Sequence, residues 1–146
     1  SIRMMKAGFN TALIPDAYVY HKRRSTFRQF YKQVHNSGIA RINLYKRHPE
    51  SLKLLHFFPA AFSLFLMGSL LVLPFTNLPL GLVLLYFLAI FIEATLSNKS
   101  PYVGLLAIIA SFIQLFSYGM GFIKAFVKRI ILGKGEFAAF EKNFYK

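Results

Sequence analysis

The feature that most constrains this chain is the separation of its charged residues from its apolar ones. Eleven of its 18 lysine and arginine residues lie in residues 1–53, whereas residues 54–98 hold no basic residue and a single acid, Glu93. A stretch of this length without charge cannot supply the polar surface that a soluble domain needs. The chain therefore divides into a basic amino-terminal part and a long apolar part.

Two clusters of turn residues divide the apolar part, at residues 74–79 and 97–101. The three apolar segments that result are residues 54–75, 80–96 and 102–123. Each is close to the roughly 20 residues that a helix needs to cross a bilayer. A soluble buried helix is the alternative for one segment, but three in succession would leave too little polar surface to cover them. We predict a mainly α-helical membrane protein, with its transmembrane region at residues 49–132 and a basic tail at residues 133–146.

Composition excludes several other classes of protein. Apolar and aromatic residues make up 55% of the chain, which excludes a disordered protein. The absence of cysteine excludes a disulfide framework, a thiol nucleophile and a cysteine-ligated zinc site. The net charge of +13 indicates contact with anions, which for a membrane protein include lipid headgroups. The chain begins with Ser1 and has no signal-peptide pattern, so we expect it to be processed or a fragment.

The first 24 residues follow a different pattern from the rest. Residues 1–7 have the composition of a short helix that ends at Gly8, the usual residue where a chain leaves a helix. Two short extended runs, residues 11–15 and 17–21, flank a turn at Pro15 and Asp16. A helix and two strands are too small to fold alone, so we expect the strands that complete this sheet to lie outside the chain.

Residues 25–48 have the composition of an amphipathic helix. Ser25 is a suitable N-cap, and apolar or aromatic residues follow at helical spacing. We expect this helix to lie in the membrane interface, with Phe27, Phe30 and Val34 in the acyl boundary and its basic residues at anionic headgroups. Gly38 would allow a bend. An amphipathic helix packed on a soluble domain is the alternative.

The sharpest local feature is His21, followed directly by Lys22, Arg23 and Arg24. An imidazole can bind a metal ion, and the basic side chains can hold the oxygens of a diphosphate. The alternative is a basic run that neutralises anionic lipid. No complete catalytic constellation accompanies it, because the acids Asp16 and Glu50 have no second carboxylate nearby in sequence.

Residues 1–24, SIRMMKAGFNTALIPDAYVYHKRR, resemble the segment that follows the acidic Glu-Asp motif of family 2 glycosyltransferases. In those enzymes a helix of the type Arg-x-x-Lys-Ala-Gly leads to a strand, a Pro-x-Ala-x-Val-x-His stretch and basic residues. Many bacterial members continue into a juxtamembrane helix and several membrane spans. The resemblance implies that residues 1–24 are the carboxy-terminal edge of a GT-A α/β catalytic domain, whose nucleotide-binding strands, Asp-x-Asp motif and catalytic base would precede Ser1.

The resemblance also implies roles for individual residues. His21 would reach a divalent metal (Mg or Mn) held mostly by upstream residues, and Lys22, Arg23 and Arg24 would bind the donor diphosphate. Gln33 and Arg41, with Arg28, would face the acceptor. Polymerising members carry a Gln-x-x-Arg-Trp motif here, but Gln33 and Arg41 are spaced differently and the chain has no tryptophan. This departure argues against a processive polysaccharide synthase.

The function expected from the resemblance is that of an inverting, metal-dependent glycosyltransferase. Its parent enzyme would move a sugar from a nucleotide-sugar donor to a lipid-linked or cell-envelope glycan acceptor, at the cytoplasmic side of a bacterial inner membrane. The chain would supply the anchor and part of the acceptor face, would be inactive alone, and would contact membrane lipids but no nucleic acid. One alternative is a small non-enzymatic basic protein that binds anionic lipid or anchors a partner. Another is a transporter or channel subunit that uses Glu93 and Gln114.

The distribution of charge makes the orientation in the membrane ambiguous. The basic residues before the first apolar segment predict a cytoplasmic amino-terminal part. Six further basic residues follow from Lys124 onward, yet three complete crossings would put that tail on the opposite side. Either the tail lies outside despite its charge, or one apolar segment does not cross the membrane completely. The first segment is a candidate because it contains Pro59, and the middle segment because it is short.

Overall fold

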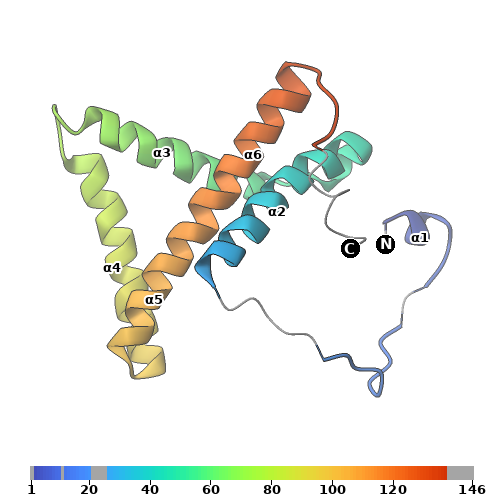
Figure 1. The fold of residues 1–146 in the computed structure, drawn as a ribbon, viewed down its shortest axis with the longest axis horizontal. Helices are drawn as coiled ribbons and strands as arrows, with labels where there is room; N and C mark the ends of the chain where they lie inside the picture. Colours follow the sequence, from blue (N-terminus) through green and yellow to red (C-terminus); the bar gives the residue numbers. More distant parts are fainter. Residues whose placement is uncertain (1, 11, 21–25, 138–146) are drawn as a thin grey trace.

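The computed structural model describes residues 2–10, 12–20 and 26–137, and helices dominate them (Figure 1). Three helices are long and apolar enough to cross a membrane, Leu54–Val72, Leu78–Asn98 and Pro101–Ile131. The prediction of three such helices is confirmed. The third extends eight residues beyond the predicted end at residue 123. The prediction stopped where hydropathy falls, at Lys124, but lysine and arginine are good helix formers and the helix continues through them.

Two helices precede the apolar part. The short α1 (Ile2–Lys6) ends as predicted at Gly8, which has a φ of +81°. The Phe9 N–H donates to Met4 O and the Gly8 N–H to Met5 O, both over 3.1 Å, which is the pattern of a Schellman motif. The longer α2 (Phe27–Arg47) is capped by Thr26, whose hydroxyl accepts from the Gln29 N–H over 3.3 Å. The prediction that Ser25 is the N-cap was one residue early.

The turn at Pro15 and Asp16 is present, and the Ala17 N–H donates to Ile14 O over 3.2 Å. The two short strands expected on either side of it are not found, because residues 12–20 contain no strand. Their large apolar side chains are all exposed, from 66% for Ile14 to 95% for Tyr20. Two short extended runs with no further strand to pair with are marginal in water, which is the physical reason for their irregular conformation.

The apolar part begins with two 3₁₀ turns, η1 (Pro49–Ser51) and η2 (Leu54–Phe57), and continues as α3 (Phe58–Val72). The next helix, α4 (Leu78–Asn98), ends at a tight turn in which Lys99 takes a left-handed conformation with a φ of 52°. The helix that follows is continuous in direction but contains four stretches: α5 (Pro101–Phe112), η3 (Ile113–Ser117), α6 (Tyr118–Phe126) and η4 (Val127–Ile131). We call the whole of Pro101–Ile131 the long helix.

α4 and the long helix form a hairpin that opens away from its turn, so that α4 packs on α5 only, and α2 lies along the second half of the long helix (Figure 1). At a rise of about 1.5 Å per residue, 31 residues extend over about 46 Å, more than the roughly 30 Å hydrocarbon core of a bilayer. The amino-terminal half of α3 packs on η3 and α6, near the middle of the long helix. From there α3 runs away from the long helix to the start of α4 (Figure 1).

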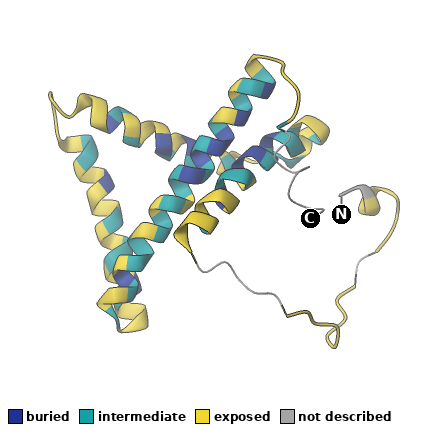
Figure 2. Cartoon of the chain, in the orientation of Figure 1, coloured by how far each residue is buried: buried dark blue, intermediate teal, exposed yellow. Residues whose placement is uncertain are grey.

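Burial is concentrated where α2, α3 and α6 meet (Figure 2). The cluster at this junction consists of Ile39, Ile42, Ala60, Phe122 and Ala125. The rings of Phe57 and Phe122 meet edge to face, with centroids 5.3 Å apart. Elsewhere α3 exposes leucine and phenylalanine, and α4 exposes leucine, which is stable in lipid but not in water.

Candidate functional site

The site residues predicted from the sequence fall into two groups. His21, Lys22, Arg23 and Arg24 lie outside the described residues. The other group lies on α2, where Arg28 and Gln33 are exposed and Arg41 is half-buried. Within the described part of the chain, no hydrogen bond or ion pair brings Arg28, Gln33 and Arg41 together, so they remain three separate positions on one helix.

The apolar face of α2 is buried against the long helix. Val34 is only 5% exposed, so the expectation that it enters the acyl boundary is wrong, whereas Phe27 is 40% exposed as that expectation requires. A methyl group added at Gly38 would lie 2.8 Å from Phe122 N and against Tyr118 O. Gly38 thus permits close contact between the backbones of α2 and the long helix. The sequence predicted that this glycine would allow a bend, but α2 is unbroken and the packing accounts for the glycine.

The long helix contributes a stripe of small residues to this contact. Ser117, Gly121 and Ala125 recur at intervals of four and are all buried. A methyl group at Gly121 would collide with the His35 backbone on α2, and one at Gly119 would lie 2.8 Å from the carbonyl carbon of Pro59 on α3. Small residues at this spacing allow helices in a membrane to pack closely.

The irregular segment η3 is tied to both neighbouring helices by polar contacts. Its i→i+5 pattern leaves carbonyls free for side chains. His35 Nδ1 on α2 lies 3.2 Å from Ser117 O, and because a carbonyl only accepts, this nitrogen carries the proton. The Ser117 hydroxyl donates in return to Tyr31 O over 2.8 Å, and the Ser63 hydroxyl on α3 approaches Phe116 O at 3.4 Å. These contacts fix the position of α2 along the long helix.

A cluster of opposite charges lies at the far end of α2. Glu136 accepts two bonds from Arg47 Nη2, at 2.9 Å and 3.0 Å, and lies 3.3 Å from Arg129 Nη2. Arg129 is only 8% exposed, and its Nη1 donates to Asn43 Oδ1. Its Nε is buried and has no hydrogen-bond partner in the described part of the chain. We call Asn43, Arg47, Arg129 and Glu136 the arginine cluster.

The arginine cluster borders a cavity of about 430 Å³, lined by Ala40, Asn43, Leu44, Arg47 and Glu136. Beside it, the ammonium groups of Lys128 and Lys124 lie over the Phe137 ring, at 3.9 Å and 5.5 Å from the ring centroid. Two arginines thus share the one described carboxylate of this region, with two lysines over the neighbouring Phe137 ring. The sequence analysis missed this cluster, because its bonds join α2 to residues 86 to 89 positions later in the chain. The only local signal was the spacing of Asn43 and Arg47 on one side of a helix.

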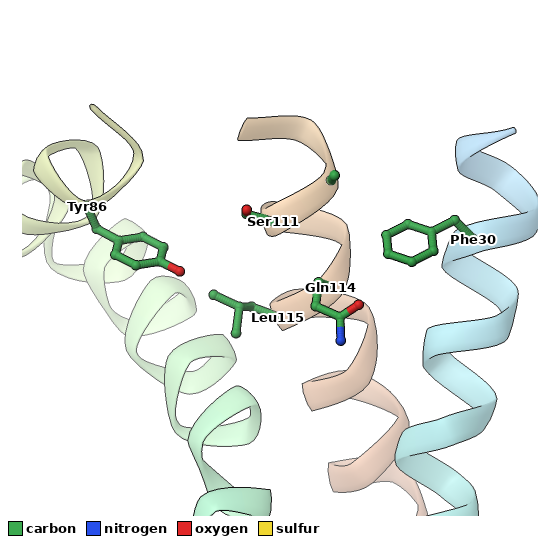
Figure 3. A pocket seen from close by; sticks show the side chains of 6 residues that line it. Phe30, Tyr86, Ser111, Gln114 and Leu115 are labelled. Atoms are coloured by element: carbon green, nitrogen blue, oxygen red, sulfur yellow. The ribbon is translucent and has the colours of Figure 1, made fainter. Parts of the chain in front are cut away.

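A second concavity, of about 300 Å³, lies nearer the middle of the long helix (Figure 3). Tyr86 on α4 and Phe30 on α2 point toward the long helix from its two sides, with Ser111 and Gln114 between them (Figure 3). Gln114, considered for a transport function, lines this concavity. Glu93, the other such residue, is exposed on α4 and accepts a bond from Ser97 over 2.9 Å. The two do not line a common cavity among the described residues.

Comparisons with protein-family models, with curated proteins and with solved structures found no match to this chain. Its chemistry must therefore be argued from its own residues.

The described residues do not fit a divalent metal ion. They contain no group of three or more histidine, aspartate, glutamate or cysteine side chains that could hold one. Of the acids, Glu50 lies on η1 and accepts a 3.0 Å bond from Lys6 on α1. Its own backbone N–H and Lys6 lower the pKa of Glu50 below the ordinary value of 4.5. Glu50 is thus an ion-pair partner that holds α1, and we derive no step through a metal.

Proposed function

We propose that the chain is the membrane-anchoring, carboxy-terminal part of an inverting, metal-dependent family 2 glycosyltransferase. The parent enzyme would transfer a sugar from a nucleotide donor to a lipid-linked or cell-envelope glycan acceptor. The divalent metal and the catalytic base would be held by carboxylates outside this chain, with His21 reaching the metal and Lys22, Arg23 and Arg24 the diphosphate. Arg28, Gln33 and Arg41 on α2 would face the acceptor.

The observation that carries this proposal is the exposure of residues 12–20. Leu13, Val19 and Tyr20 are 88% to 95% exposed, in a segment that bears the strongest resemblance to the glycosyltransferases. A run of apolar side chains with nothing to cover it is a surface that needs a partner. The missing strands of a GT-A sheet are a partner that would also pair its free backbone groups.

The packing of α2 supports the anchoring role. Because α2 is fixed to the long helix at Gly38 and Gly121, a catalytic domain joined to Thr26 would be held at a constant position relative to the bilayer. The basic residues in the last turn of α2, Lys46 and Arg47, would then lie at the height of anionic headgroups, beside the end of the long helix. A bacterial inner membrane with this face in the cytoplasm agrees with the excess of lysine and arginine before the first apolar helix.

The arginine cluster also supports one answer to the orientation in the membrane. Arg47 precedes the first apolar helix and Glu136 follows the third, yet the two are bonded. An even number of complete crossings must therefore separate them. The two crossings would be α4 and the long helix, which form a hairpin. The remaining apolar helix, Leu54–Val72, runs from the middle of the long helix to the start of α4 (Figure 1) and would enter the membrane without crossing it.

The test is sugar transfer by the protein of the complete reading frame. We expect activity that requires Mg²⁺ or Mn²⁺, and no transfer by the 146-residue chain alone. In the complete protein His21→Ala should lower the rate and weaken the metal dependence, whereas Lys99→Ala, at the opposite end of the hairpin, should change neither. A reading frame with no Asp-x-Asp and no Glu-Asp motif before Ser1 would contradict the proposal.

The second candidate is a non-enzymatic basic membrane protein that binds anionic lipid. The surplus of cations around Glu136 favours it. It predicts that a start codon lies just before Ser1 and that the chain is stable and complete without a catalytic domain. The same reading frame therefore distinguishes the two candidates.

A further inference from the structure

The arginine cluster contains more positive charge than the described residues neutralise. Arg47 and Arg129 share the single carboxylate of Glu136, whose side chain is 42% exposed. The side chain of Arg129 is 9% exposed. A buried charge of this kind is unfavourable unless it is paired and hydrogen-bonded. Here the pairing is shared between two guanidinium groups.

The hydrogen bonds of Arg129 are also incomplete. A guanidinium carries five N–H donors. Nη1 is used by Asn43 and Nη2 by Glu136, while Nε is buried and has no partner among the described residues. Leaving a buried donor unpaired costs free energy, so an anion with several acceptor oxygens would be a better partner than one shared carboxylate.

The cavity beside Glu136 offers room for such an anion. Its volume is about 430 Å³, and Asn43 and Arg47 line it together with Glu136 itself. The two apolar members of its lining, Ala40 and Leu44, lie on the same helix. A guanidinium binds either a carboxylate or a phosphate through two parallel hydrogen bonds. A carboxylate has only two oxygens, in one plane, whereas a phosphate has further oxygens for a second guanidinium.

The position of the cluster indicates which phosphate. It lies at the end of a 31-residue apolar helix, next to Lys124 and Lys128. Lysine and arginine at the end of such a helix meet the headgroup region of the bilayer. We propose that Arg47 and Arg129 bind the phosphate of an anionic membrane lipid, and that Glu136 is the internal occupant that the lipid displaces. This site is independent of any glycosyltransferase activity.

The test compares lipid binding by the full chain and by single variants in a zwitterionic detergent. Native mass spectrometry would measure the apparent Kd of the first bound lipid, for phosphatidylglycerol and phosphatidylcholine with the same acyl chains. For the unmodified chain we expect phosphatidylglycerol to bind about tenfold more tightly, the difference that one charge-assisted contact provides. Equal binding of the two lipids would overturn the proposal.

The variants separate a built site from general positive charge. Arg129→Gln and Arg47→Gln should each abolish the preference for phosphatidylglycerol, and Arg129→Lys should restore only part of it because the fork is lost. Glu136→Gln should tighten binding about threefold or more, since it removes a charged competitor from the site. Lys134→Gln is the matched control, because it removes one exposed charge two residues from Glu136 and should leave the preference intact. Equal effects of Lys134→Gln and Arg129→Gln would overturn the proposal.

Two further measurements complete the design. If circular dichroism shows that Arg129→Gln does not fold, the tightening expected from Glu136→Gln carries the test, and its absence counts against the site. Inorganic phosphate at the concentration of the lipid should not displace phosphatidylglycerol. Displacement at equal concentration would mean that the ligand is a soluble phosphate and not a lipid.

Discussion

At the scale of single residues, the glycines of the helix contacts differ sharply from the other helical glycines. Gly38, Gly119 and Gly121 each face the backbone of a neighbouring helix, whereas Gly68 on α3 and Gly81 on α4 have open space where a side chain would stand. The sequence alone assigns all five the same low helix propensity. Only the packing distinguishes a glycine that is required from one that is tolerated.

Gly38→Ala should therefore destabilise the chain, by about 1 to 3 kcal/mol, because its methyl group would force α2 away from Phe122. The measurement is unfolding of the helices in detergent, followed by circular dichroism. Gly68→Ala is the control, and we expect it to be neutral or stabilising by up to about 1 kcal/mol. Equal stabilities of the two variants would contradict the close approach of α2 and α6.

The ion pair of Lys6 and Glu50 makes the docking of α1 dependent on pH. Because the pKa of Glu50 is lowered, its contribution is complete above pH 4.5 and is lost as the pH falls through the lowered pKa. His48 Nδ1 lies 3.8 Å from the same carboxylate and is a further, smaller cause of the lowered pKa of Glu50. We expect α1 to be docked more firmly at pH 7 than at a pH below the lowered pKa of Glu50.

The docking of α1 can be measured by NMR with a spin label at Ser51→Cys, which would broaden the amide signals of Ala7 and Gly8 while α1 is docked. The broadening should weaken at low pH in the unmodified pair. In Glu50→Gln it should be weak at every pH, since no carboxylate remains to titrate. Release of α1 at the same pH in Glu50→Gln would show that another group is responsible.

At the scale of elements, α2 is amphipathic in a way that its sequence describes only in part. The helical spacing of its apolar residues correctly predicts one buried face. Whether that face meets lipid or protein depends on a stripe of small residues more than 80 positions later, at Ser117, Gly121 and Ala125. An amphipathic pattern records that a face is apolar, and not what covers it.

Lipid-attached quenchers would distinguish these two environments. We expect a fluorophore at Phe27→Cys to be quenched strongly, because Phe27 is 40% exposed, and one at Val34→Cys to be quenched weakly if the helix contact is kept. Ser37→Cys, exposed and polar, serves as the reference for the water-facing side. Quenching at Val34→Cys as strong as at Phe27→Cys would mean that α2 lies free on the membrane surface.

At the scale of the whole molecule, the bond between Arg47 and Glu136 joins the two ends of the membrane part. It agrees with the distribution of basic residues, which are numerous both before the first apolar helix and after Lys124. Two complete crossings would place Arg47 and Glu136, and both basic regions, on the same side of the membrane. Three crossings would separate them.

Because the chain has no cysteine, single cysteines can be introduced without further changes. In oriented vesicles, a membrane-impermeant maleimide should label Lys46→Cys and Lys134→Cys from the same side, and Lys99→Cys, in the turn of the hairpin, from the opposite side. Prior permeabilisation, which exposes both sides, is the control for reactivity. Labelling of Lys134→Cys together with Lys99→Cys would indicate three crossings.

The sequence by itself determined the class of the protein, the existence of three apolar helices and of α2, and the end of α1 at Gly8. These features follow from local composition, periodicity and backbone preference, which act over a few residues. It did not determine the end of the long helix, because hydropathy stops at the first lysine while the helical hydrogen bonds continue through Arg129.

The tertiary structure alone decided how these helices are used. It turned Val34 and Gly38 toward the long helix, left residues 12–20 without strands, and brought Asn43 and Arg47 to Arg129 and Glu136. Each of these outcomes depends on a contact between residues far apart in the chain, and no local pattern records which distant surface a helix will meet. For the same reason, a buried arginine whose Nε has no partner within the described structure is visible only once the chain is folded.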